Sequence, residues 1–286
     1  MPVDFRLQYK QTLSEPPRII TPTAQSLFTI DDLIRRGVVY YSEKKDVSNR
    51  YIGVPKALEQ ACNAAGNDGV IASLPYLIAG KAQSDRNSSY LWKDWFTALS
   101  EEHVGIDKAG KHVGVGKPLV MVVHGGGILT YERIMQAYTE GLTSQNAAKL
   151  TSSEFDSIVN GTLPNGQSIQ IYTVDDIKRG RIADPFGRYA VALDLETAKA
   201  TTSGYHKKAG FMSNILVHAR AGTLAHLETY FDKAKDRDRD VGNHHSLAEM
   251  DPQIPQGRLL FLYSGHDGLY GDGLDFFGRF VGVRKK

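Results

Sequence analysis

One run of nine residues constrains the fold of this chain more than any other part of it. Leu119 to Val123 are apolar without interruption, and they lead directly into His124 and three consecutive glycines, Gly125 to Gly127. An uninterrupted apolar run is typical of a strand buried on both faces, as in a parallel sheet. A helix is expected from Ile128 to Tyr138. The sequence therefore predicts a strand, a glycine-rich loop and a helix in succession.

The glycine-rich loop predicts a site for an anion. Glycine leaves the backbone amides unshielded and free to adopt unusual dihedral angles, and the helix N-terminus beyond the loop adds unpaired N–H groups and the positive end of a dipole. We expect Gly125, Gly126 and Gly127 to bind a small anionic ligand, such as a phosphate-bearing metabolite or a nucleotide. Arg181 and Arg188 could hold its phosphate or carboxylate. The alternative is that the glycines only allow a tight turn and close helix packing.

Strand and helix patterns alternate along the rest of the chain, which favours an α/β architecture. Strands are predicted at 38–41, 169–172, 188–195, 215–218, 259–263 and 276–283, and helices at 31–36, 55–65, 90–102, 151–159, 174–179 and 223–235, with Thr29, Thr151 and Thr173 as N-caps. We expect a mixed, mostly parallel central sheet flanked by helices in a single domain, residues 30–286. An irregular N-terminal arm, residues 1–29, precedes it, and a division near residue 150 is the alternative.

Two histidines are predicted to follow strands directly. His124 comes after the apolar run, and His266 follows the strand predicted at 259–263. In an open α/β sheet the carboxyl ends of parallel strands are where ligands bind, and histidine can transfer protons near neutral pH. His124, His266 and the adjacent Asp267 are therefore the candidate catalytic residues of a small-molecule enzyme that carries out hydrolysis or group transfer.

The His-Gly-Gly-Gly run at 124–127 resembles the oxyanion-hole loop in the lipase and esterase branch of the α/β-hydrolases. The resemblance implies that the glycine amides hold the oxygen of a tetrahedral intermediate, and that a Gly-x-Ser-x-Gly motif follows. No such motif occurs downstream of residue 127. A dinucleotide fingerprint fails because Thr130 stands at its last glycine, and a Walker loop fails because Pro118 follows Gly116-Lys117.

Two other functions remain open. A metal-dependent hydrolase could use His244, His245 and Glu249 together with His266, although their spacing matches no zinc signature. A non-catalytic assembly or interaction protein would instead form a homo-oligomer through the N-terminal arm, and its glycine loop would be packed shut. The sequence predicts no particular cofactor.

Composition narrows the class of protein. The net charge is +2 and the basic residues are scattered, so a nucleic-acid partner is not expected. Cys62 is the single cysteine, which excludes an intrachain disulfide and fits a reducing compartment. The apolar stretches fall short of the roughly 20 residues that span a membrane, so we expect no membrane partner and a soluble, cytoplasmic protein.

Overall fold

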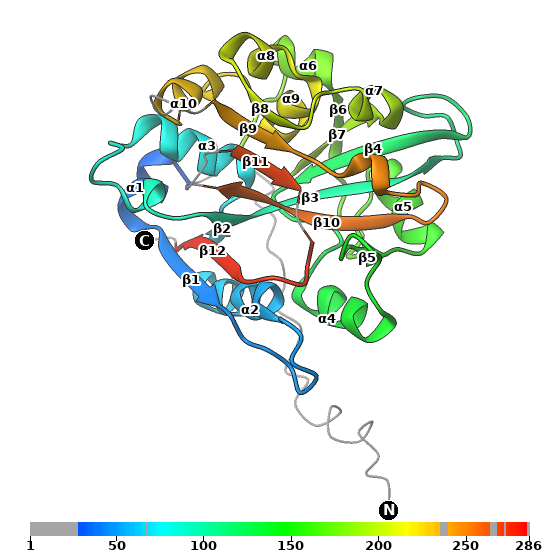
Figure 1. Ribbon diagram of the computed structural model, residues 1–286, viewed down its shortest axis with the longest axis horizontal. Helices are drawn as coiled ribbons and strands as arrows, with labels where there is room; N and C mark the ends of the chain where they lie inside the picture. The colour runs from blue at the N-terminus through cyan, green and yellow to red at the C-terminus, as the bar shows by residue number, and fades with distance from the viewer. Residues whose placement is uncertain (1–27, 67, 235–239, 264–267, 272, 285–286) are drawn as a thin grey trace, which may run out of the picture.

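A computed structural model describes residues 28–66, 68–234, 240–263, 268–271 and 273–284 (Figure 1). Within them the main sheet consists of β3 (Phe96–Asp107), β4 (Lys117–His124), β5 (Ala148–Lys149), β6 (Gln170–Thr173), β7 (Tyr189–Asp194), β8 (Gly204–His206), β9 (Val241–His244), β10 (Gln256–Tyr263) and β11 (Gly268–Gly271). Their order in the sheet is β6-β7-β4-β3-β10-β11-β9-β8, and β5 pairs with β10 outside this path. The longest strand, β3, and its neighbour β4 thus form a central hairpin.

A second, smaller sheet joins segments from the two ends of the described chain. Its order is β1-β12-β2, and its strands are β1 (Val38–Ser42), β2 (Val70–Ile71) and β12 (Gly278–Val283). The helices are α1 (Ile30–Arg36), α2 (Gly53–Ala65), α3 (Leu74–Gln83), α4 (Tyr131–Glu140), α5 (Ser152–Val159), α6 (Val174–Lys178), α7 (Leu195–Lys199), α8 (Lys208–Ser213), α9 (Ile215–Ala221) and α10 (Leu227–Ala234), with short 3₁₀ turns at Tyr90–Trp92 and Leu247–Glu249. In Figure 1, α8, α9 and α10 lie above the long strands, and α2 and α4 lie below them.

The prediction of a mostly parallel central sheet was wrong. Among the described strands only the β6/β7 and β11/β9 pairs are parallel, and every other pairing is antiparallel. The apolar run in β4 misled the prediction because both faces of this antiparallel sheet are covered. Val120 and Val122 belong to one core with α3, α9 and α10, whereas Leu119, Met121 and Val123 belong to a second core with α2, α4 and α5.

The predicted helix N-caps are confirmed. Thr29, Thr151 and Thr173 each form a capping box with an acidic residue three positions later. Two predicted elements were wrong. Residues 90–102 form a 3₁₀ turn and the start of β3 instead of one helix, and residues 215–218 begin helix α9 instead of a strand.

The predicted N-terminal arm lies outside the described residues, except for its last two. Phe28 is buried, and Thr29 caps α1. The single domain at 30–286 stays a prediction. No helix in the described part of the chain is both long enough and apolar enough to cross a membrane.

Candidate binding site

The glycine loop binds a carboxylate that belongs to the chain itself. The amides of Gly127, Ile128 and Leu129 donate to the side-chain oxygens of Glu101 at 2.6, 2.9 and 3.2 Å. His103 Nε2 lies 2.7 Å from the same carboxylate, and both side chains are fully buried. A Cβ atom at position 127 would lie 2.6 Å from a Glu101 oxygen, so the close approach of the carboxylate requires glycine there.

The other two glycines of the loop are required by backbone conformation. Gly125 and Gly126 have φ values of +75° and +89°, in the region that L side chains rarely adopt. Their amides both donate to the carbonyl of Leu99, at 2.9 and 3.2 Å. Leu99 lies at an irregularity in β3, where the pairing with β10 shifts between Ala98 and Glu101. A bulge in one strand thus fixes the turn that follows its neighbour β4.

His124 is held inside the protein by contacts at both ring nitrogens. Nε2 lies 3.0 Å from the carbonyl oxygen of Ala219, and Nδ1 lies 2.9 Å from Ser100 Oγ. Because Ser100 Oγ also accepts the amide of Leu74 at 2.9 Å, the arrangement is satisfied when Nε2 donates and Nδ1 accepts. Burial lowers the pKa of His124 to about 4, although the bond to Ala219 opposes this shift. The ring is therefore neutral at neutral pH.

Of the two arginines that were predicted to bind the anion, Arg188 lies beside the glycine loop. It donates through Nε to the carbonyl of Gly125 at 3.1 Å and through Nη1 to Gln167 Oε1 at 2.7 Å. Burial lowers its pKa, and the charge of Glu101 opposes this change. Arg181 instead pairs with Asp176 at 3.0 Å on the exposed surface.

The three described candidates for metal ligands, His244, His245 and Glu249, do not form a metal site. His245 Nε2 lies 3.2 Å from both oxygens of Thr201, His244 packs among aromatic rings, and Glu249 is exposed. In the described residues no group of three or more His, Cys, Asp or Glu side chains could hold a metal ion. The two remaining catalytic candidates, His266 and Asp267, lie outside the described residues.

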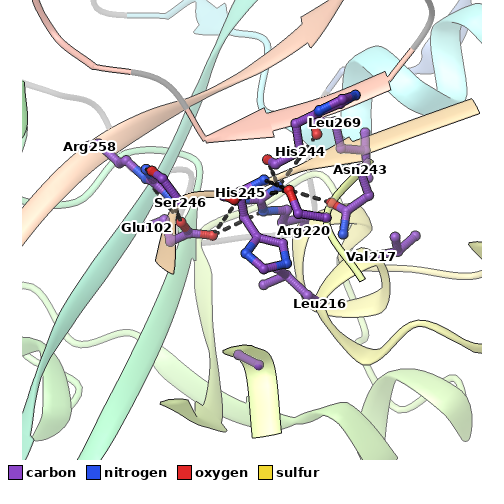
Figure 2. A network of polar contacts seen from close by, with 12 residues as sticks. Glu102, Leu216, Val217, Arg220, Asn243, His244, His245, Ser246, Arg258 and Leu269 are labelled. Carbon is purple, nitrogen blue, oxygen red and sulfur yellow. Dashed lines mark hydrogen bonds and ion pairs between the residues drawn. The ribbon is translucent and has the colours of Figure 1, made fainter. Parts of the chain in front are cut away.

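A buried ion network lies on the face of the sheet opposite Glu101 (Figure 2). One Glu102 oxygen accepts from Arg220 Nε at 3.0 Å, and the other accepts from Arg258 Nε and Nη2 at 3.0 and 2.6 Å. All three side chains are at most 1% exposed. Burial alone would raise the pKa of Glu102, but the charges of the two arginines outweigh burial and hold the pKa at about 2. One carboxylate thus faces two guanidinium groups.

The network joins strands that are distant in sequence. Arg220 Nη1, from α9, donates to Asn243 Oδ1 and to the carbonyls of His244 and Leu269, at 2.9, 2.8 and 3.4 Å. Figure 2 shows these bonds meeting at one guanidinium, beneath the strands β9 and β11. A Cβ atom at Gly271 would lie 2.7 Å from Nη2 of both arginines, so the network requires a glycine in β11.

Four aromatic rings form a continuous row across β8, β9, β11 and β10. We call this set, Tyr205, His244, Tyr270 and Tyr263, the aromatic row. Successive ring centroids are 5.1, 4.5 and 5.6 Å apart, and the His244 and Tyr270 rings are stacked within 7° of parallel. The strand registers put all four side chains on the same face of the sheet, opposite Asn243 and Leu269. Tyr205 and Tyr263, at the two ends, are 48% and 38% exposed.

Two glycines make room for the central pair of rings. A Cβ atom at Gly242 would lie 2.9 Å from the His244 ring, and one at Gly268 would lie 2.9 Å from the Tyr270 ring. Burial lowers the pKa of His244, and the nearby His206 and Arg220 lower it further. The backbone beneath the row is fixed from the opposite face of the sheet by the ion network.

Sequence reasoning missed both the ion network and the aromatic row. The signal for the network was Arg258 inside an otherwise apolar strand, because an arginine buried there requires an acidic partner. The signal for the row was weaker. Tyr270 lies in a Gly-Leu-Tyr-Gly segment, but its partner strands are known only from the fold.

Comparisons with known proteins give one informative result. No family model matches the chain, and no curated protein matches it. One solved structure, from work on the "accommodation of massive sequence variation in Nanoarchaeota by the C-type lectin fold", aligns with a TM-score of 0.63. The alignment covers 87% of this chain and 99% of that chain at 22% sequence identity.

This likeness overturns the predicted function together with the predicted fold. The expectation of a hydrolase or transferase that binds a phosphate-bearing ligand at a glycine-rich loop was wrong. It depended on a parallel α/β sheet, whereas the similar structure has a C-type lectin fold. In this chain, moreover, the amides of residues 127–129 already bind Glu101. At 22% identity the likeness carries the fold alone, and it shows that this chain has the C-type lectin fold.

Proposed function

We propose that this chain is a binding protein that recognises a protein partner through its aromatic row. The observation that carries the proposal is the row itself, with Tyr205 48% exposed and Tyr263 38% exposed at its two ends. Tyrosine is enriched where proteins recognise one another, because its ring supplies a large and rigid contact area together with a polar group. A row whose two central rings are half-buried and whose two ends are exposed suits such a contact.

The way the row is supported favours recognition over a purely structural role. The strands beneath it are fixed from the opposite face by Arg220, which bonds to the backbone carbonyls of His244 and Leu269. These bonds do not involve the side chains of the row, so those side chains can change while the strands stay in place. The similar solved structure is described as accommodating massive sequence variation in its fold, and the same separation of face and support in this chain is consistent with that use.

The proposal is tested with a random peptide library displayed on phage and selected against the immobilised protein. Peptides recovered on the wild-type chain should lose affinity for the Tyr205→Ala and Tyr270→Ala variants. At a binding hot spot the loss is about 2 kcal/mol, which is about 30-fold in Kd. The matched control is Ile254→Ala, because Ile254 is as exposed as Tyr205 and lies outside the row.

Two results would count against this function. If the selected peptides bind the tyrosine variants and the Ile254 variant with equal affinity, the row is not the recognition surface. If no peptide binds but a glycan array gives hits that depend on Tyr205 and Tyr270, the partner is a carbohydrate and the proposed class is wrong.

A further inference from the structure

Strand β1 is an open edge of the smaller sheet. It is the outer strand in the order β1-β12-β2, and among the described strands it pairs with β12 alone. Figure 1 shows it at the left-hand boundary of this sheet. Natural edge strands are usually protected by charged residues, proline or a bulge. The sequence of β1, Val-Val-Tyr-Tyr-Ser, has no charge and no proline, and its register with β12 contains no shift.

The pairing of β12 shows which backbone groups of β1 face outward. The amide of Ala72 donates to the carbonyl of Val281 at 2.8 Å, so the backbone groups of Val281 face β2 and not β1. Val39 is the partner of Val281 in the register, and it therefore belongs to a pair without hydrogen bonds to β12. The N–H and C=O groups of Val39, and of Tyr41 two residues further on, point away from the sheet. Within the described residues no hydrogen bond to these groups occurs.

The side chains on this edge are apolar and exposed. Of the nine exposed large hydrophobic side chains in the described chain, three lie in this strand of five residues: Val38 at 52%, Val39 at 39% and Tyr41 at 40% exposed. An edge that offers free backbone groups together with apolar side chains is a template for pairing with another strand.

The symmetry of the edge fits β1 of a second copy. The outward groups belong to Val39 and Tyr41, which lie one residue to either side of Tyr40. If two β1 strands pair antiparallel about a two-fold axis at Tyr40, Val39 of each copy lies opposite Tyr41 of the other, and each such pair exchanges both of its N–H···O bonds. The same register puts a β-branched side chain against an aromatic one, which is a favourable cross-strand pair. The outward groups of both residues are then satisfied in both copies.

The charges on either side of the strand are compatible with this pairing. The first charged residue before β1 is Arg36 and the first after it is Glu43, so antiparallel pairing brings Glu43 of each copy close to Arg36 of the other. The wider flanks each hold two acidic and two basic residues: Asp31, Asp32, Arg35 and Arg36 before the strand, and Glu43, Lys44, Lys45 and Asp46 after it. The pairing therefore opposes no net charge with a like net charge.

We propose that this chain forms a two-fold symmetric dimer in which the β1 strands of two copies pair antiparallel. The two smaller sheets then become one continuous sheet with the strand order β2-β12-β1-β1-β12-β2. The dimer is closed, because each copy uses its single β1 edge and leaves no second edge of this strand for a third copy. This inference is independent of the function proposed above, because β1 belongs to the smaller sheet and the aromatic row to the larger one.

The first test is the mass of the full chain in solution, measured by light scattering after size-exclusion chromatography over a concentration series. The wild-type chain should reach twice the mass of one copy. Val39→Lys should have the mass of one copy at the same concentrations, because the dimer would bury one lysine charge on each side of its axis. The matched control is Val115→Lys, because Val115 is 79% exposed and lies outside β1; this variant should remain dimeric.

A crosslinking experiment then tests the register. In a Cys62→Ser background, Val38→Cys chains are mixed with Ser42→Cys chains and oxidised. The proposed pairing puts these two residues opposite each other, so the mixture should form a disulfide between the two kinds of chain. Either kind alone should not, because each residue then lies four positions, or roughly 14 Å, from its own copy, which is beyond the reach of a disulfide.

Four results would each overturn the proposal. They are a wild-type chain that is monomeric at every concentration, as expected if another part of the same chain covers the edge, a Val39→Lys chain that stays dimeric, a mixture of cysteine chains that does not crosslink, and a single kind of cysteine chain that crosslinks as well as the mixture. Circular dichroism confirms that each variant is folded.

Discussion

Replacing Glu102 with glutamine should destabilise the protein severely, because it removes the carboxylate that pairs with two buried arginines. Arg220 and Arg258 are 0% and 1% exposed, so their charges cannot be solvated by water when Glu102 is neutral. Breaking a buried ion pair by removing one partner costs about 3–5 kcal/mol. The pKa gives a similar magnitude, since a shift of Glu102 from 4.5 to about 2 corresponds to about 3 kcal/mol.

Because two arginines share one glutamate, the network also predicts which of its variants loses more stability. Arg258→Met leaves Glu102 paired with Arg220, a neutral pair, and should cost less than Glu102→Gln, which leaves two unpaired cations. The Glu102 contribution also depends on pH in a defined way. Its folded pKa of about 2 lies below the ordinary value of 4.5, so the contribution is complete above the ordinary value and is lost as the pH falls toward 2. The stability difference between wild type and Glu102→Gln should therefore shrink across that interval.

The assay is urea unfolding followed by circular dichroism, with the melting temperature as a second readout. For a chain of this size about 2 °C of melting temperature corresponds to 1 kcal/mol, so Glu102→Gln should melt about 6–10 °C lower. The control is Glu196→Gln, which breaks an exposed pair with Lys199 and should cost less than about 0.5 kcal/mol. Two results would refute the reasoning: a loss of less than about 1 kcal/mol for Glu102→Gln, or a larger loss for Arg258→Met than for Glu102→Gln. In either case the difference from the expected free energy of unfolding is larger than the error of the measurement.

Three further predictions concern the two cores and the aromatic row. His124 has a folded pKa of about 4, below its ordinary value of 6.5. The wild-type chain should therefore lose up to about 3 kcal/mol of stability as the pH falls from 6.5 to 4. In His124→Gln the free energy of unfolding, measured over the same pH range, should depend less steeply on pH. Glu101→Ala should lower the melting temperature, because the amides of residues 127–129 lose their acceptor. Added acetate should restore part of the loss. If acetate leaves the melting temperature of the variant unchanged, the three amides do not keep their arrangement without Glu101. Gly268→Ala should be destabilising because its Cβ would lie 2.8 Å from a backbone oxygen of β9, while Gly210→Ala, which meets nothing closer than 3.7 Å, should be neutral or stabilising by thermal melting.

Local features of the fold could be predicted because their chemistry lies within a few residues. The three threonine caps depend on an acidic residue three positions away, and all three form as expected. Strand β3 could not be predicted in this way. Trp92, Trp95, Phe96 and Leu99, which run from the preceding 3₁₀ turn into β3, have the spacing of a helix. The strand is buried on both faces, and a register shift beside Leu99 interrupts its alternation.

The candidate site was harder to predict because it depends on contacts between distant segments. Glu101 lies 26 residues before the amide of Gly127 that it accepts from, so the sequence could indicate amides suited to an anion but not which anion occupies them. The aromatic row has the same difficulty, since Tyr205 and Tyr270 are joined only through β9. Without the strand order, neither tyrosine differs from an ordinary surface residue.

Glu101 and Glu102 are adjacent residues whose carboxylates are fixed in opposite cores, and this arrangement restricts how β3 can pair during folding. A slip of one residue would exchange the two faces of the strand, and a slip of two would put Ser100 or Val104 where Arg258 now meets Glu102. A slip of two leaves the buried guanidinium groups without a carboxylate, and a slip of one leaves either those groups or the amides of residues 127–129 without one. Each loss costs far more than a misplaced apolar contact. The two acidic residues thus select one alignment of β3 with its neighbours β4 and β10 from several that hydrophobic burial alone would permit. Buried charge in this sheet specifies a register that apolar residues alone would not.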